Sequence, residues 1–366
     1  MNKTSSFRRI PSLRRARTEW SLILLTAALS LFGVLIISSS SRFEYQPVSF
    51  ANHMLHVALG AAVLIGLSFF DCTKLEKHPG WLYAAGVLLP LYCLFFGAEA
   101  EGVRRWLRLG AFAVSVNAAS CALLPVAFCG FLSRLRGRGY AAIAGLMLLA
   151  LCSLLPFLVQ PSMGTAFLLL AVYGALLVRA AMQRRFGGDC SAQLPFALAL
   201  LALSVLAALA LPIFLRPGDA ALAGFGAARG QIAELIRSAA AIGQSPHAQS
   251  ADRIIPELAT DFAPLNVVIQ FGWLAGLALC ALFGVLIARL ALVSRRAVSA
   301  FGSDLSFAAM LMLALPFCVS VLISLGLIPC IDVALPFVAY GGTHYLSCMA
   351  YVGLALAVWR RGGMTV

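Results

Sequence analysis

The chain has 366 residues, of which 61% are hydrophobic and 11% are charged, and its mean hydropathy is +0.94. This composition excludes an ordinary soluble globular protein, in which about a quarter of the residues are charged. The formal net charge of +13 requires no nucleic-acid partner, because membrane topology and anionic lipid headgroups account for it. We therefore predict an all-α, polytopic membrane protein with no nucleic-acid partner.

The chain begins with a basic tail, residues 1–19, which contains Pro11 and little that could be buried. We expect this tail to be disordered or to lie on the inner leaflet. No small-residue cleavage site follows the first apolar run, so we expect that run to remain as a membrane anchor.

Apolar runs of membrane-spanning length recur from residue 20 onward, and we interpret residues 20–366 as one membrane domain. An even number of spans places both termini on the same side. The positive-inside rule assigns that side to the cytoplasm, so the predicted location is the cytoplasmic membrane. The ten predicted transmembrane helices are residues 20–40, 53–70, 80–97, 111–132, 140–158, 163–181, 193–215, 264–290, 305–328 and 337–359.

Three arginines, Arg104, Arg105 and Arg108, flank Trp106 in a predicted outer loop, against the positive-inside rule. One interpretation is an interfacial anchor, in which Trp106 lies in the aromatic belt and the arginines meet lipid phosphates. The other is a clamp for a phosphorylated substrate, because the arginine fork matches phosphate oxygens. We favour the clamp.

A tight outer turn follows at residues 160–166, with the sequence Gln-Pro-Ser-Met-Gly-Thr-Ala. Taken alone, it predicts only a turn into a helix.

A long extracytoplasmic loop, residues 216–263, joins the seventh and eighth predicted helices. Loops of this length are uncommon unless they are functional or disordered. A helical stretch near residues 231–241 places Ile232, Leu235 and Ile236 on one face, and such a helix could lie on the outer leaflet.

The long loop ends at Thr260-Asp261-Phe262, with Glu257 just upstream. A carboxylate here could cap the following helix, since Asp is favoured at N-caps and Pro264 suits the first helical turn. It could equally take a proton from a sugar hydroxyl at the membrane surface. The residue types alone leave capping and catalysis equally open.

The last hydrophobic stretch contains Pro336, Tyr340, Gly341 and Gly342. These residues predict broken or closely packed backbone, which a membrane protein tolerates only where protein or a cavity surrounds it. We expect His344 to be a hydrogen-bonded packing residue. The ten cysteines lack metal-type spacing, so we expect packing residues and neither a metal site nor a disulfide framework.

Taken together and in this order, the motifs resemble the SEDS family (shape, elongation, division and sporulation; FtsW/RodA-like), over about residues 20–359. The resemblance rests on four segments of this sequence: Arg104-Arg105-Trp106 with Gly110, Gln160-Pro161 with Gly164-Thr165-Ala166, Pro256-Glu257 with Thr260-Asp261-Phe262, and Leu335-Pro336-Phe337 with Tyr340-Gly341-Gly342.

This resemblance implies a ten-helix peptidoglycan glycosyltransferase that polymerises lipid II at the outer face of the cytoplasmic membrane, for cell division or elongation. The implied partners are lipid II, a class B penicillin-binding protein and other membrane proteins of the divisome or elongasome. The family's candidate catalytic aspartate matches Asp261, which would be the general base. The cofactor is open, with a divalent cation possible. The implied substrate-binding residues are Arg104, Arg105, Trp106, Arg108, Glu257, Thr260, Tyr340, Gly341 and Gly342.

The chain departs from the family pattern where the family has an intramembrane glutamate and lysine, because Ala118 and Cys121 occupy those positions. Both charges are absent together, as expected of a pair, since one left alone in lipid would be costly. The family's Glu-Glu-Leu-Gly reads Ile269-Gln270-Phe271-Gly272, and by the predicted boundaries no Asp, Glu or Lys remains deep in a span.

Two alternatives to the polymerase follow from these departures. The first is a catalytically weak scaffold that holds a class B penicillin-binding protein. The second is a flippase for a lipid-linked precursor, which the scarcity of ionisable residues along the spans disfavours.

Overall fold

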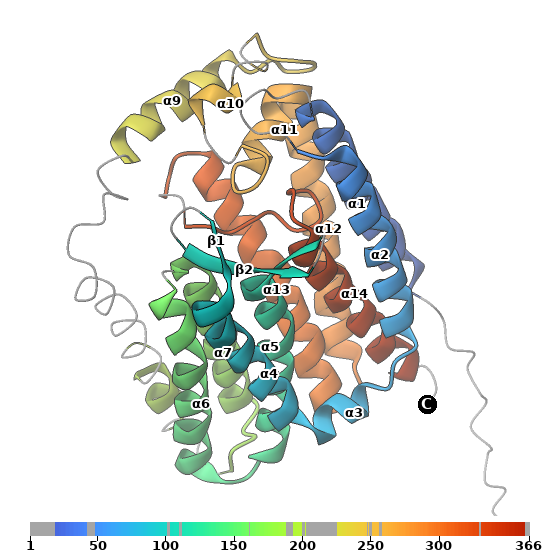
Figure 1. Cartoon of the computed structure of the whole chain (residues 1–366). Helices are drawn as coiled ribbons and strands as arrows, with labels where there is room; N and C mark the ends of the chain where they lie inside the picture. The colour runs from blue at the N-terminus through green and yellow to red at the C-terminus, as the bar shows by residue number, and fades with distance from the viewer. Residues whose placement is uncertain are drawn as a thin grey trace, which may run out of the picture.

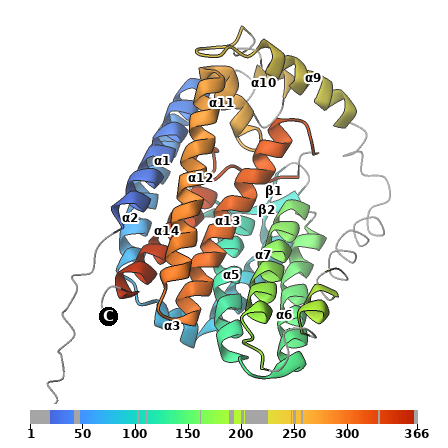
Figure 2. The same cartoon turned by 180° about the vertical axis from the view of Figure 1, so that it is seen from behind.

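The computed structural model consists of long helices packed side by side, with one small sheet in the part of the chain that it describes (Figures 1 and 2). The described residues are 19–41, 48–100, 103–109, 112–160, 162–187, 193–199, 202, 225–246, 248, 251–255, 258–328 and 331–362. Both views place helix α9 (Phe225–Ser238) at one end of the molecule and helix α3 (Cys72–Lys77) at the other, and we refer to these as the α9 end and the α3 end.

Within the described residues, eight helices are long and apolar enough to cross a membrane, which confirms a polytopic membrane protein. The total of ten stays a prediction, since most of the predicted span 193–215 and the basic tail lie outside the described residues. The eight helices are α1 (Trp20–Ser40), α2 (Phe50–Ser68), α4 (Pro79–Phe96), α5 (Val116–Arg134), α6 (Gly139–Val159), α7 (Met163–Met182), α12 (Trp273–Arg296) and α13 (Ala300–Ser324).

A three-stranded antiparallel sheet corrects the all-α expectation and the predicted start of a helix at residue 111. Strands β1 (Ala98–Ala100), β2 (Val103–Leu109) and β3 (Phe112–Ser115) lie in the order β1-β2-β3. In the register, Trp106 of β2 faces Ala98 on one side and Ser115 on the other. Alternating apolar and charged residues with an aromatic ring favour a strand, and α5 begins only after the sheet.

The predicted helix 264–290 is broken into α11 (Ala263–Phe271) and α12, with Gly272 between them. Gly272 has φ of 90°, and a Cβ there would lie 2.7 Å from the carbonyl oxygen of Ala241. Only glycine adopts this backbone conformation in so little space. Beyond the break, the N–H groups of Trp273 and Leu274 donate to the carbonyls of Ala240 and Ala241.

Helix α9 (Phe225–Ser238) packs on the protein, which corrects the expectation that its apolar face lies on the outer leaflet. Ile232 and Leu235 are buried in a hydrophobic cluster that also contains Leu258, Phe262 and Ile323. Short helix α10 (Ala251–Ile254) lies beside α9, at the same end of the molecule as α11 (Figures 1 and 2). Helix α9 therefore packs against the turn that carries Asp261.

The last helix, α14 (Gly342–Gly362), covers most of the predicted span 337–359 but begins five residues later, at Gly342. It packs closely against α2, as α4 packs against α5 and α12 against α13. Its middle is buried among other helices, with Tyr351 and Val352 2% and 0% exposed. The late start leaves an irregular segment between α13 and α14 that organises the candidate site.

Candidate active site

Asp261 lies in the turn 258–262 that leads into α11, and it is only 2% exposed. Its Oδ2 accepts a hydrogen bond from the backbone N–H of Val333 at 3.2 Å. Its carbonyl oxygen accepts another from Oγ of Ser320, in α13, at 2.8 Å. Asp261 is thus held between α13 and the irregular segment before α14.

The capping role considered for Asp261 is not what the structure shows. The N-cap of α11 is Phe262, and no side-chain hydrogen bond caps this helix, although Pro264 does occupy its first turn as predicted. Thr260 is half-buried, and Glu257 lies outside the described residues. A buried carboxylate that does not cap its neighbouring helix needs another explanation.

Residues 331–341, called here the 331–341 segment, form irregular backbone between α13 and α14. Leu335 and Phe337 are fully buried in it, and Phe337 has a positive φ of 63°. The N–H of Tyr340 donates to the carbonyl of Ala259 at 3.0 Å, which ties the segment to the turn of Asp261. The broken, closely packed backbone predicted from the prolines and glycines is confirmed.

The three arginines lie on strand β2, where successive side chains point to opposite faces of the sheet. Arg105 therefore faces away from Arg104 and Arg108, and it forms an ion pair with Asp332 of the 331–341 segment. Arg104 donates to the carbonyl of Phe95 at 3.4 Å, and Arg108 is exposed. Trp106, on the same face as these two, is half-buried. Of the three arginines, Arg105 is the one whose ion pair lies next to the partner of Asp261.

The turn after α6 also meets the 331–341 segment, which the sequence of the turn alone did not predict. A Cβ on Gly164 would overlap the carbonyl oxygen of Ile331, so glycine allows the closest approach. Gln160 donates to the carbonyl of Pro90 at 2.7 Å. Ser162 accepts a hydrogen bond from the side-chain amide of Asn117 at 2.6 Å. The 331–341 segment is therefore contacted by residues from three of the four motifs and contains all of the fourth except Gly342.

Gly342, the first residue of α14, packs against His56, a residue that the sequence motifs do not include. A Cβ on Gly342 would overlap the ring of His56, whereas Gly341 has no such close neighbour. The ring of His53 lies 6.3 Å from the ring of Tyr340, centroid to centroid. Ring nitrogens of both histidines are buried with no partner among the described residues. Two histidines three residues apart inside a predicted span were a signal for this contact.

The positions without the family's charged pair lie against α14. The carbonyl of Ala118 accepts a hydrogen bond from Ser347 at 2.9 Å, and the carbonyl of Cys121 accepts one from the hydroxyl of Tyr351. Just before them, the N–H of Ser115 donates to Thr343 at 3.0 Å. Neutral hydroxyl groups of α14 thus bind this face of α5 through its backbone.

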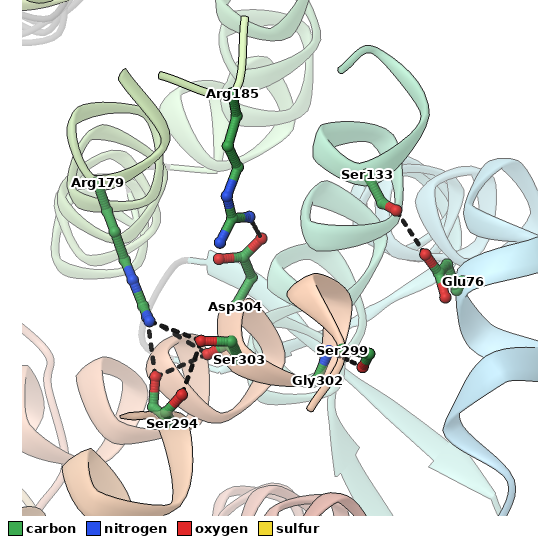
Figure 3. A network of polar contacts seen from close by, with 9 residues as sticks. All are labelled: Glu76, Ser133, Arg179, Arg185, Ser294, Ser299, Gly302, Ser303 and Asp304. Atoms are coloured by element: carbon green, nitrogen blue, oxygen red, sulfur yellow. Dashed lines mark hydrogen bonds and ion pairs between the residues drawn. The ribbon is translucent and has the colours of Figure 1, made fainter. Parts of the chain in front are cut away.

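A second polar cluster lies toward the α3 end of the molecule (Figure 3). Helix α13 begins at Ala300, five residues earlier than predicted, so Asp304 lies inside the helix and is 1% exposed. Asp304 forms an ion pair with Arg185. Nearby, Arg179 donates to Ser294 at 2.9 Å and to Ser303 at 2.8 Å, which joins α7 to α12 and α13.

Metal and disulfide chemistry have little visible support in the described part of the chain. No three His, Cys, Asp or Glu side chains come together there as metal ligands. The eight described cysteines carry free thiols.

Comparison with known proteins gives matches over nearly the whole chain. The model of the FtsW/RodA/SpoVE family, described as a cell cycle protein, matches residues 17–362. A probable peptidoglycan glycosyltransferase FtsW of Halorhodospira halophila is 29% identical and covers 92% of this chain and 89% of its own length. A second, from a Thioalkalivibrio strain, is 28% identical and covers 95% and 92%.

Solved structures share the fold. A chain of a peptidoglycan synthase complex, described as coordinating polymerisation and crosslinking, matches with a TM-score of 0.69 at 25% identity and covers 94% of this chain and 98% of that one. The rod shape determining protein RodA of Thermus thermophilus matches with a TM-score of 0.65 at 22% identity, over 94% and 97%.

Proposed function

The chain belongs to the FtsW/RodA/SpoVE family of cell cycle proteins, and on that basis we propose that it is a peptidoglycan glycosyltransferase that polymerises lipid II. Membership confirms the SEDS resemblance drawn from the sequence motifs. The observation that carries the proposal is the convergence on the 331–341 segment, where Val333 donates to Asp261 and the adjacent Asp332 pairs with Arg105. The candidate base and the candidate phosphate-binding cation thus contact two adjacent residues of this segment.

In the proposed reaction, a hydroxyl oxygen of the acceptor sugar attacks the anomeric carbon of the donor sugar. The bond between that carbon and the lipid pyrophosphate oxygen breaks, and lipid pyrophosphate leaves with the bonding electrons. Asp261 takes the proton of the attacking hydroxyl as general base. The 2% exposure of Asp261 supports this role, because electrostatic interactions are strongest where water is excluded.

Arg104, Arg105 and Arg108 would offset the charge that develops on the pyrophosphate. Their alternation on β2 supports a division of this task, with Arg105 nearest the segment that contacts Asp261 and the other two on the opposite face. We further propose Trp106, Thr260, Tyr340, Gly341, Gly342 and, outside the described residues, Glu257 as contributors to substrate binding.

The protein is a multi-pass protein of the cytoplasmic membrane. We propose ten spans with both termini in the cytoplasm, which leaves the α9 end and Asp261 on the outer side. The proposed protein partners are a class B penicillin-binding protein and other divisome or elongasome membrane proteins. The similarity to a chain of a synthase complex that couples polymerisation to crosslinking supports such a partner.

A catalytically weak scaffold is the second candidate, and one observation favours it. The backbone carbonyls of Ala118 and Cys121 are bound by hydroxyls of α14, at the positions where the family has its charged pair. If that pair is needed for chemistry, this chain would hold its partner without polymerising lipid II. The flippase alternative has no comparable support.

The test is polymerisation of lipid II by the purified full chain, alone and with a class B penicillin-binding protein. Asp261→Asn is expected to abolish the glycan product and to leave the unfolding temperature nearly unchanged. Glu234→Gln is the matched control, because Glu234 is an exposed carboxylate on α9. Full activity of Asp261→Asn would reject the role of the carboxylate, and complementation of a null mutant in cells by that variant would favour the scaffold.

A further inference from the structure

Asp332 occupies an unusual position for a non-glycine residue. Its φ is 58°, in the left-handed region that most side chains avoid but that Asp and Asn tolerate better than others. Its side chain is 56% exposed, yet it forms an ion pair with Arg105, whose side chain is 20% exposed. We expect a non-glycine residue that is held in this conformation and paired with a largely buried arginine to have a specific role.

The carboxylate of Asp332 binds the guanidinium group of Arg105 in the way that a substrate phosphate would. Arginine presents a planar fork of N–H donors that fits a carboxylate or a phosphate equally well. An anion that arrives at Arg105 must therefore compete with Asp332 for those donors. In the structure, the carboxylate of Asp332 occupies the guanidinium group of Arg105.

The next residue connects this ion pair to the candidate base. Val333 donates its N–H to Oδ2 of Asp261 at 3.2 Å, and a donated N–H stabilises the negative charge of a carboxylate. A shift of Asp332 moves Val333, because the two share a peptide unit. On the other side, the close approach of Gly164 to the carbonyl of Ile331 limits where the backbone can go.

We propose that Asp332 is a positioning residue that occupies Arg105 until the pyrophosphate of the lipid-linked substrate replaces it, and that its release withdraws the N–H of Val333 from Asp261. This inference rests on the proposed function, because it takes a lipid pyrophosphate as the ligand of Arg105. Loss of this hydrogen bond makes Asp261 a better proton acceptor, so the change occurs only when substrate is bound.

The binding test uses undecaprenyl pyrophosphate and the purified full chain, in a double-mutant cycle of Arg105→Gln and Asp332→Asn. Asp332→Asn should tighten binding by up to about fivefold, the range expected for a partly exposed ion pair. Arg105→Gln should weaken binding, and Asp332→Asn should then have no further effect. Undecaprenol, which lacks the anion, should bind all four proteins alike.

Asp332→Gly is the second variant, because glycine suits a φ of 58° and also removes the carboxylate. Unfolding temperatures establish that each variant folds. In the polymerisation assay, the gain in Asp332→Asn should appear as a lower KM, whereas a purely structural role for Asp332 would lower kcat. Asp332→Glu keeps a carboxylate at this position, so its KM should be closer to the wild-type value than that of Asp332→Asn.

The outcomes separate this inference from the function. If wild type polymerises lipid II but Asp332→Asn binds no tighter, or binds tighter equally without Arg105, the role of Asp332 is rejected and the function stands. If the cycle behaves as expected but no glycan forms, the polymerase is rejected and the competition at Arg105 stands. Wild type that polymerises lipid II but binds no undecaprenyl pyrophosphate overturns the competition at Arg105 and leaves the function standing.

Discussion

The backbone N–H of Val333 lies 3.2 Å from Oδ2 of Asp261, and the residue before Val333 is Asp332, the partner of Arg105. One peptide unit therefore links a buried carboxylate to an arginine that is far from it in the sequence. The positions of both side chains depend on how the 331–341 segment packs, and substitutions at its contacts can test that packing.

Gly164→Ala should shift the 331–341 segment, because the added Cβ would overlap the carbonyl oxygen of Ile331. We expect a loss of about 1–3 kcal/mol in the free energy of unfolding, typical of overpacking. Polymerisation should fall by about tenfold or more, since small displacements of reacting groups are costly. Thermal unfolding and lipid II turnover measure the two effects.

Gly145→Ala is the control for this substitution. Gly145 lies in α6, and a Cβ there would meet nothing within 4 Å. Alanine in a helix interior should be neutral or stabilise by up to about 1 kcal/mol. Equal loss of activity in the two variants would contradict the assigned contact.

Ser320→Ala should weaken the support of Asp261, because it removes the hydroxyl that donates to the carbonyl of Asp261 at 2.8 Å. The expected cost is about 1 kcal/mol of unfolding free energy, with a fall in polymerisation rate per folded molecule.

Ser306→Ala is the matched control for Ser320→Ala. Both serines are fully buried in α13, but the hydroxyl of Ser306 has no hydrogen-bond partner among the described residues. Its removal should be neutral or slightly stabilising. Destabilisation by Ser306→Ala as large as that by Ser320→Ala would show that the bond to Asp261 is not the cause.

Hydropathy predicted most of the helices because each apolar run must satisfy its own backbone in lipid. The long, uninterrupted helices α1, α6 and α7 lie within two residues of their predicted ends. The break at Gly272 escaped this reasoning, since it depends on contacts with Ala241 that only the folded chain provides. The sheet at residues 98–115 was missed because an alternating strand of seven residues is a weak signal beside long apolar runs.

For the site, the motifs identified Asp261 and the arginines but not how they are connected. Asp332 has a short polar side chain in an irregular segment, and nothing in the sequence indicates that it reaches strand β2. His53 and His56 were overlooked, although they lie three residues apart, because a histidine in an apolar run more often serves packing. The contact of His56 with Gly342 depends on how α2 packs against α14 in the folded chain.

Asp71 should make stability depend on pH in the acid range. Hydrogen bonding to the Arg361 side chain, followed by that to Thr73, lowers the pKa of Asp71 below its ordinary value. A carboxyl whose pKa is lower in the folded state contributes stability above its unfolded pKa of about 4, and this stability is lost as pH falls through the folded value. Asp71→Asn should lower the unfolding temperature at neutral pH and flatten its acid dependence.

The neighbouring arginine provides the control for Asp71. Arg361→Gln should flatten the same acid range, because it removes the ion-pair partner of Asp71. Arg360→Gln should not, because the guanidinium of Arg360 lies 4.0 Å from the ring centroid of Phe69, which does not titrate. An unchanged pH dependence in Arg361→Gln would contradict the assignment.

The pair of Arg185 and Asp304 should matter for stability and not for chemistry (Figure 3). Asp304→Ala leaves Arg185 buried without its carboxylate, which costs about 3–5 kcal/mol in comparable cases. The double variant Asp304→Leu with Arg185→Met removes both charges, and we expect it to be close to wild type or more stable. Asp304 and Ser320 lie 16 residues apart on α13, about 24 Å at the rise of an α-helix, so the folded double variant should polymerise lipid II normally. Thermal unfolding and turnover of the two variants test this separation, and a folded, stable double variant without polymerase activity would show that the cluster at the α3 end takes part in the reaction.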